Sequence, residues 1–133
     1  MTEIRVRYGE TDQMGVVYHA NYIVWCEIGR TEYIRECGMS YDALERAGTK
    51  LAVTDLMVRL HASARYDEIL RVTTRLAAVR SRAVEFEYEI TRPADGVRIA
   101  TASTTLTSLS PGGRVVALPS TVKTLLERGP LVE

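Results

Sequence analysis

Apolar and polar residues alternate along much of the second half of this chain, which is typical of β-strands with one packed and one solvated face. The alternation is strictest over 84–90, where Val84, Phe86, Tyr88 and Ile90 are separated by glutamates. The same kind of pattern predicts strands over 3–8, 51–62, 69–79 and 97–109, with a short strand over 114–118. The segment Pro93-Ala94-Asp95-Gly96 predicts a tight turn between two of them.

A different periodicity predicts one long helix from about Asn21 to Cys37, with Gly38 as its stop signal. At about 100° per residue, one broad face collects Tyr22, Ile23, Cys26, Gly29, Tyr33, Ile34 and Cys37. Val24, Trp25 and Ile28 fall elsewhere, so the first half of the helix is apolar nearly all round and should be covered on more than one side. A short helix is expected from Ser40, its N-cap, through Ala47, and a last one from Pro119-Ser120 to Gly129.

Arg30 falls in the middle of the apolar face of the long helix. A buried guanidinium needs a partner, and Glu27, one turn earlier, is the local candidate for an ion pair.

The order of elements is strand, loop, long helix, short helix, four strands with a short one after them, and a final helix. Helices segregated from a mainly antiparallel sheet predict an α+β fold. We expect one domain over residues 1–133, with the sheet wrapped around one long central helix.

Composition narrows the class of protein. The 17 basic and 17 acidic residues give a net charge of zero, which argues against nucleic-acid binding. No apolar run approaches the ~20 residues of a membrane span, and no secretory signal is visible at the start. Cys26 and Cys37 are too far apart on one helix to bridge, and they make a poor zinc site, so reduced thiols, a cytoplasmic location and no metal are expected.

The candidate chemistry is concentrated in the loop that precedes the long helix. Asp12 lies between Gly9 and Gly15, and it could act as a catalytic carboxylate or simply form an Asx-turn. His19 lies at the helix start, where its imidazole could act as acid or base, or its backbone N–H could stabilise charge on a carbonyl oxygen. It could equally cap the helix without any catalytic role.

Other candidates are weaker. Tyr8 is expected at the end of the first strand, from where its hydroxyl could reach the loop. His61 is expected to be structural. Arg80, Ser81 and Arg82, near a connection between strands, could contact a nucleotide phosphate or be solvated charge. The chain has no G-x-S-x-G motif and no Gly-rich phosphate loop of the common patterns.

The pattern Tyr8-x-x-Thr11-Asp12-x-x-Gly15-x-x-x-His19-x-Asn21-Tyr22, followed by Glu27-x-x-Arg30-x-Glu32-Tyr33, resembles the hotdog-fold acyl-CoA thioesterases. The subgroup is that of 4-hydroxybenzoyl-CoA thioesterase and the Tol–Pal-associated thioesterase. A second match is Ala64-Arg65-Tyr66-Asp67-Glu68-Ile69-Leu70, in which Ser63 stands where the family commonly has Pro and Glu68 where Asp is usual. The similarity runs over about residues 3–128.

The resemblance implies hydrolysis of an acyl-CoA, with a short-chain or aromatic acyl group, by the Asp12 carboxylate and an amide at the helix start near His19. In the Tol–Pal-type branch, the positions of Tyr8, Asp12 and His19 are taken as the active site. The resemblance also implies homodimers that extend the sheet, often homotetramers, with a site between subunits and no cofactor besides the coenzyme A of the substrate.

Three alternatives stay open. They are a hotdog hydratase or dehydratase, a non-catalytic acyl-CoA-binding or interaction protein, and a structural domain whose loop merely caps a helix.

Overall fold

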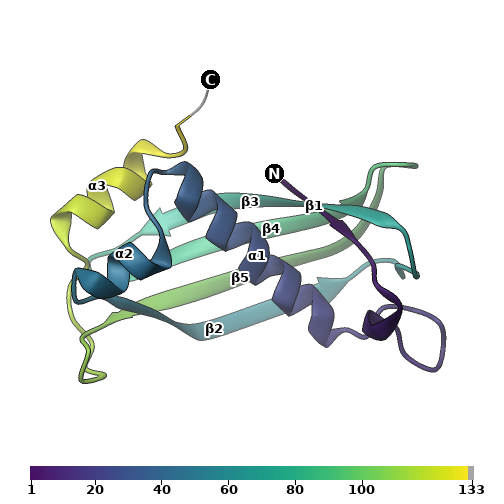
Figure 1. Ribbon diagram of the computed structural model, residues 1–133, viewed down its shortest axis with the longest axis horizontal. Coiled ribbons are helices and arrows are strands. Elements are labelled where there is room, and N and C mark those ends of the chain that lie inside the picture. The colour runs from purple at the N-terminus through teal and green to yellow at the C-terminus, as the bar shows by residue number, and fades with distance from the viewer. Residues whose placement is uncertain (132–133) are drawn as a thin grey trace.

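A five-stranded antiparallel sheet carries the fold in the computed structural model, which describes residues 1–131. The strands are β1 (Thr2–Arg5), β2 (Lys50–Leu60), β3 (Ile69–Val79), β4 (Ala83–Arg92) and β5 (Val97–Leu109), in the spatial order β1-β3-β4-β5-β2. The helices are α1 (Ala20–Glu36), α2 (Tyr41–Arg46) and α3 (Ser120–Arg128), with a 3₁₀ helix η1 (Tyr8–Glu10). Figure 1 shows α1 crossing the sheet diagonally, with α2 and α3 at one end and the loop that follows η1 at the other.

The α+β class and most element positions agree with the periodicity of the sequence. The long helix, the strands over 69–79 and 97–109 and the turn at 93–96 lie where they were predicted. Ser40 caps α2 by accepting a hydrogen bond from the Ala43 N–H at 3.1 Å. The short strand expected over 114–118 was wrong, because that segment makes only an isolated bridge between Leu109 and Val115.

The first strand ends earlier than the alternation predicted. β1 stops at Arg5, and the chain then closes a tight turn in which the Glu10 carboxylate accepts the Arg7 N–H at 2.7 Å. Tyr8 therefore lies in η1 and is 77% exposed, instead of closing a strand on its packed side.

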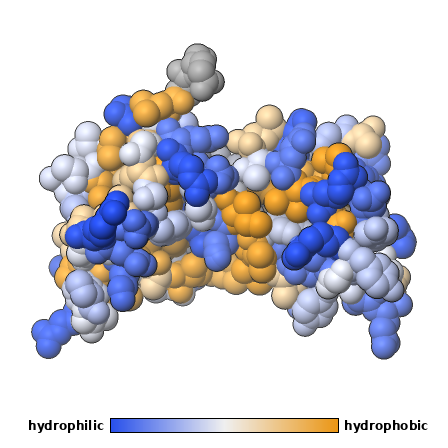
Figure 2. Space-filling model, viewed as in Figure 1, coloured by the Kyte–Doolittle hydropathy of each residue, from blue (hydrophilic) through white to orange (hydrophobic). Residues whose placement is uncertain are grey.

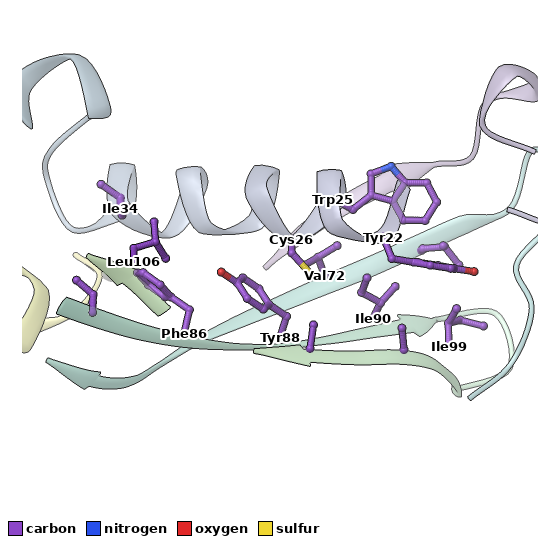
Figure 3. Packing of buried hydrophobic residues seen from close by; sticks show 14 of the residues in the cluster. Tyr22, Trp25, Cys26, Ile34, Val72, Phe86, Tyr88, Ile90, Ile99 and Leu106 are labelled. Carbon is purple, nitrogen blue, oxygen red and sulfur yellow. The ribbon is translucent and has the colours of Figure 1, made fainter. Parts of the chain in front are cut away.

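The core lies between α1 and the sheet (Figure 3). Tyr22, Cys26 and Ile34 of α1 pack on buried residues of the central strands, among them Val72 and Phe86. At Gly29 the helix approaches the sheet so closely that an added Cβ would lie 2.7 Å from Thr74 Oγ1 and 2.8 Å from Val72 Cγ1.

The buried side of α1 differs from the predicted face at two positions. Trp25 is buried because its indole N–H donates to Glu10 Oε2 at 3.2 Å, whereas Ile23 is 38% exposed. The sheet covers one side of α1 in the single chain, and Val24 and Ile28 on the helix stay exposed. Within residues 1–131 of one chain, the sheet therefore does not wrap around α1 as predicted.

Arg30 is buried as predicted, but its partner is not Glu27. Its Nε donates to the Tyr41 hydroxyl at 2.9 Å and one terminal nitrogen donates to the Tyr88 hydroxyl at 3.2 Å. The Tyr88 hydroxyl lies 2.6 Å from Thr104 Oγ1, and Figure 3 shows it pointing toward α1. Two elements distant in sequence thus provide neutral partners for the cation.

Both cysteines are buried free thiols, as predicted. Burial raises the pKa of Cys26 to about 12, although the nearby Arg30 charge acts in the opposite direction. In the described residues, none of the helices has the length and apolar character needed to traverse a lipid bilayer.

Candidate active site

The loop between η1 and α1 is shaped by its own backbone hydrogen bonds. The Asp12 N–H donates to the Val16 carbonyl at 2.9 Å, and the Gly15 N–H donates to the Asp12 carbonyl at 3.0 Å. Gly15 has a φ of +78°, which an L side chain rarely adopts. Val16 also bridges Arg65, so the loop is tied to the segment that precedes β3.

Asp12 forms the Asx-turn that its surroundings predicted. Its Oδ1 accepts the Met14 N–H at 2.9 Å, which fixes the direction of the carboxylate. Within residues 1–131, Oδ2 accepts no hydrogen bond. The turn role and a chemical role are therefore compatible, because one oxygen holds the group and the other is available.

Asp12 and His19 line the same open cavity, which has a volume of about 360 Å³. The loop and the first turn of α1 form one wall, and the end of β2 with the residues after it forms the other. The full lining consists of Asp12, Val16, Val17, His19, Tyr22, Leu60, His61, Ala62 and Ser63.

His19 is the N-cap of α1, with φ −58° and ψ −29°, and its side chain makes no capping hydrogen bond. The backbone N–H groups of His19 and Ala20 have no acceptor within residues 1–131, whereas those of Asn21 and Tyr22 bond back to Tyr18 and His19. Free N–H groups at a helix start form a positive site for a developing negative charge. The exposed imidazole packs against Tyr18, with ring centroids 4.5 Å apart, and can also reach solvent.

Glu10 supports the site, and sequence reasoning overlooked it. Its buried carboxylate binds the Arg7 N–H and the Trp25 indole, while its carbonyl accepts from the Asn21 side chain at 2.9 Å and from the Tyr18 N–H. These bonds join η1, the loop and α1. A glutamate in a polar loop gives no sequence signal for such burial, since its partners come from three separate segments.

His61 was expected to be structural, yet it lines the cavity with Asp12 and His19. Its Nε2 lies 2.9 Å from Thr101 Oγ1 on β5, and it is exposed. The strand pattern had extended this strand to Ala62, whereas β2 ends just before His61. That position after a strand end would have indicated a role in the site, because strand ends border sites more often than strand centres.

The remaining predicted residues lie elsewhere. The Tyr8 ring packs edge-on against Tyr66, with centroids 5.8 Å apart, and Tyr8 does not line the cavity. Arg80, Ser81 and Arg82 form the β3–β4 connection, where Arg80 pairs with Glu85.

That connection lies at the far end of the sheet from the cavity. Thr107 pairs with Ala83 beside the connection, while Ala100 pairs with Leu60 at the cavity. Seven residues of strand span about 23 Å. The 80–82 segment therefore cannot contact a ligand moiety held close to Asp12 of the same chain.

No group of three or more metal-ligating side chains occurs within the described residues. The cavity is lined by one carboxylate with a free oxygen and by the imidazoles of His19 and His61, and the helix start at His19 and Ala20 carries two backbone N–H groups without an acceptor in residues 1–131. Such a set can stabilise an oxyanion and move a proton.

Comparison with known proteins gives consistent results. The profile of the Thioesterase-like superfamily matches residues 6–126. The chain is 40% identical to the putative acyl-CoA thioesterase YneP of Bacillus subtilis over 76% of this chain and 73% of that one. It is 36% identical to the acyl-CoA thioester hydrolase YbgC of Escherichia coli over 65% of each chain.

Among solved structures, the DHNA-CoA thioesterase from Staphylococcus aureus superposes with a TM-score of 0.85. The two chains are 35% identical, and the superposition covers 99% of this chain and 95% of that one.

Proposed function

This chain belongs to the Thioesterase-like superfamily, and we propose that it hydrolyses acyl-CoA thioesters in the cavity shared by Asp12 and His19. The names of YneP and YbgC support hydrolysis of an acyl-CoA, and the structural relative is likewise named for a CoA thioester. The observation that carries the proposal is that a carboxylate with a free oxygen and a helix start with free N–H groups border the same hollow.

The helix start supplies the electrostatic part of the reaction. A thioester carbonyl placed against the N–H groups of His19 and Ala20 would find fixed donors for the negative charge that develops on its oxygen. These donors cost no reorganisation during the reaction, because neither has an acceptor within residues 1–131 to give up.

Asp12 supplies the second part, by one of two routes. Its free oxygen attacks the carbonyl carbon, the C–S bond breaks to release the CoA thiolate, and water then hydrolyses the acyl anhydride. Alternatively, Asp12 takes a proton from water, the resulting hydroxide attacks the carbonyl, and the tetrahedral oxyanion collapses with loss of the thiolate. Both routes yield a free acid and CoA.

An isotope experiment can identify the nucleophilic route. A single turnover in H₂¹⁸O with excess enzyme leaves the acid product unlabelled and puts ¹⁸O into Asp12 if Asp12 is the nucleophile and water attacks the Asp12 carbonyl of the anhydride, because the transferred oxygen then comes from the protein. The general-base route labels the product in that first turnover.

The role of Asp12 is tested by Asp12→Asn, which keeps an amide oxygen for the Met14 N–H and so should retain the fold. We expect kcat/KM for acyl-CoA hydrolysis to fall by about 10²-fold or more. Asp42→Asn, on the exposed side of α2, is the matched control and should be near wild type. Turnover of the Asp12 variant close to wild type would remove Asp12 from the mechanism.

A second chain completes this proposal. Ile23 and Val24 of α1 line a hollow together with residues of the long edge strand β2, and Figure 2 shows hydrophobic surface around this region. We propose a homodimer, assembled further into a homotetramer, in which the sheet continues across two chains and α1 is enclosed. The partner would also bring its own 80–82 segment to the CoA phosphates, because this segment of the same chain lies about 23 Å along the sheet from the cavity.

The acyl group, the cofactor, the domain organisation and the location are proposed from the resemblance to the same family. We propose a short-chain or aromatic acyl group, no cofactor besides the CoA of the substrate, a single domain and a cytoplasmic location. A thiol-release screen across short, long and aromatic acyl-CoA esters, with enoyl-CoA hydration as the rival assay, tests the acyl class.

A further inference from the structure

Arg30 is a buried cation that has no carboxylate partner in the part of the chain that the structure describes. It is 7% exposed, and no Asp or Glu oxygen of residues 1–131 lies within 4.0 Å of its guanidinium. Its two hydrogen bonds go to the Tyr41 and Tyr88 hydroxyls, although a guanidinium has five N–H donors. Several donors are therefore available to another acceptor.

The charge on Arg30 is retained in this setting. Burial by itself lowers the pKa of the guanidinium, but the Tyr41 and Tyr88 hydroxyls more than offset that effect and the pKa lies above its usual value. Burial raises the pKa of both tyrosines, so they stay neutral. A buried charge is normally paired with an opposite one, and here the described residues provide only neutral oxygens.

Two hollows adjoin Arg30. The first, about 330 Å³, lies between α1 and β2 and is mostly apolar, and we name it the α1–β2 groove; its lining is Ile23, Val24, Glu27, Arg30, Val53, Leu56 and Thr104. The second, about 370 Å³, shares Glu27 and Arg30 with it and extends toward Tyr41. The cation thus lies where the two hollows meet.

The α1–β2 groove lies along the same two elements as the reaction cavity. Tyr22 and Leu60 line the cavity, while Ile23 and Leu56 line the groove, so each wall continues from one hollow to the next along α1 and β2. The order along this path is thioester site, apolar walls, and then a buried positive charge.

We propose that Arg30 is a specificity-determining residue that binds a carboxylate at the far end of the acyl chain, so that ω-carboxyl acyl-CoA esters are preferred substrates. This inference rests on the proposed hydrolysis at Asp12. A planar guanidinium matches a carboxylate with two parallel hydrogen bonds, and the apolar walls suit the methylene groups in between.

The helix sets the length of such a chain. His19 and Arg30 are eleven residues apart, or about 16 Å along the axis, and a helical arginine side chain leans back toward the N-terminus. An extended chain advances about 1.2 Å per bond, which corresponds to an acyl group of roughly eight to twelve carbons. On this point the inference replaces the short-chain or aromatic acyl group that the family suggests.

Glu27 allows a test of whether negative charge near Arg30 disfavours a bound carboxylate. It is exposed, it lines both hollows and it lies beyond ion-pair distance from Arg30, so it would repel a bound carboxylate. In the proposed dimer, the second copy also lies against α1 and β2, so the acyl chain would run between the two chains along the α1–β2 groove. A carboxylate from that second copy is the competing occupant of the site.

The experiment compares saturated and ω-carboxyl acyl-CoA esters of equal length, about eight to twelve carbons, by thiol release. For the wild type we expect kcat/KM to favour the ω-carboxyl ester. Arg30→Met should fold, because Met has a similar size and the partners left behind are neutral hydroxyls, of which Tyr88 keeps its contact with Thr104. It should lower the preference by about tenfold or more, while Glu27→Gln should raise it.

Binding to the Asp12→Asn variant by calorimetry, with the same pair of esters, gives a readout independent of turnover. There too the ω-carboxyl ester should bind more tightly, and Arg30→Met should remove the difference. Hydrolysis of saturated esters with no preference for a terminal carboxylate would overturn the role of Arg30 and leave the proposed function standing. An Arg30→Met variant that turns monomeric with unchanged preference would assign the site to the second copy. Failure to cleave any acyl-CoA would reject the proposed function itself.

Discussion

At His19, the role of the backbone N–H at the start of α1 can be separated from the role of the imidazole by mutation. Its backbone φ of −58° is one that proline adopts, and its N–H has no acceptor within residues 1–131. A proline at this position would therefore remove the donor without breaking a hydrogen bond of the folded chain.

We expect His19→Pro to lower kcat by about 10²–10³-fold, the usual cost of losing an oxyanion donor. His19→Ala removes the imidazole but keeps the N–H, and it should lose less than about tenfold. Circular dichroism and thermal unfolding check that both variants fold. A severe loss in the alanine variant, equal to that of the proline variant, would assign the chemistry to the imidazole instead.

The buried thiol of Cys26 makes the fold less stable as the pH rises. Burial raises its pKa from 9.0 to about 12, so above pH 9 the unfolded chain releases the thiol proton while the folded chain keeps it. The free energy of unfolding therefore decreases as pH rises from 9 toward 12, by up to about 1.4 kcal/mol per pH unit for this group.

Urea unfolding at pH 8, 9, 10 and 11 tests this slope. Wild type should lose stability more steeply with pH than Cys26→Ala, which lacks the group, although the alanine variant starts lower because of its cavity. Parallel slopes for the two proteins would show that the thiol does not contribute.

At the scale of elements, the sequence predicted what depends on local periodicity and turn chemistry. The helix over 20–36, the strands over 69–79 and 97–109 and the Ser40 cap are such features. The partner of Arg30 was not predictable in this way, since Tyr88 is 58 residues away and Glu27 is the only acid within one preceding turn. Burial of Trp25 depends equally on Glu10, on a separate segment.

The contact between α1 and β3 depends on the missing side chain at Gly29. We expect Gly29→Ala to destabilise the fold by about 1–3 kcal/mol, because the added Cβ would lie 2.7 Å from Thr74 Oγ1, and this outweighs a helix-propensity gain of about 1 kcal/mol. Gly9→Ala is the matched control, since nothing lies within 4 Å of a Cβ there. Chemical denaturation measures both, and a Gly29 variant as stable as the control would show that the helix can shift outward at little cost.

At the scale of the whole molecule, the sequence identified the loop and the acid that border the cavity but not the opposite wall. Asp12 and His19 belong to one short segment, so their proximity follows from spacing. His61 and Ser63 reach the cavity only because β2 returns beside α1, and Tyr8 leaves it because the chain turns at Arg7. Those placements depend on tertiary packing, which no local pattern contains.

The proposed dimer gives a prediction at the same scale. Leu56→Lys would place a charge in the apolar region between α1 and β2, and we expect it to yield a monomer in analytical ultracentrifugation with activity greatly reduced. Met57→Lys, one residue along on the opposite face of the strand, is the control and should remain associated. A dimeric Leu56 variant would exclude this surface from the interface.

The free side of β2 also has a consequence for how the protein would behave in dilute solution. Along the outer side of this eleven-residue strand, alternate residues have backbone N–H and C=O groups that pair with no other strand of residues 1–131. A second copy would pair with them by mass action. If the reaction cavity is complete only in the dimer, the turnover rate per protein molecule increases with protein concentration and then reaches a plateau. The concentration of the protein would thereby control its specific activity without a separate effector.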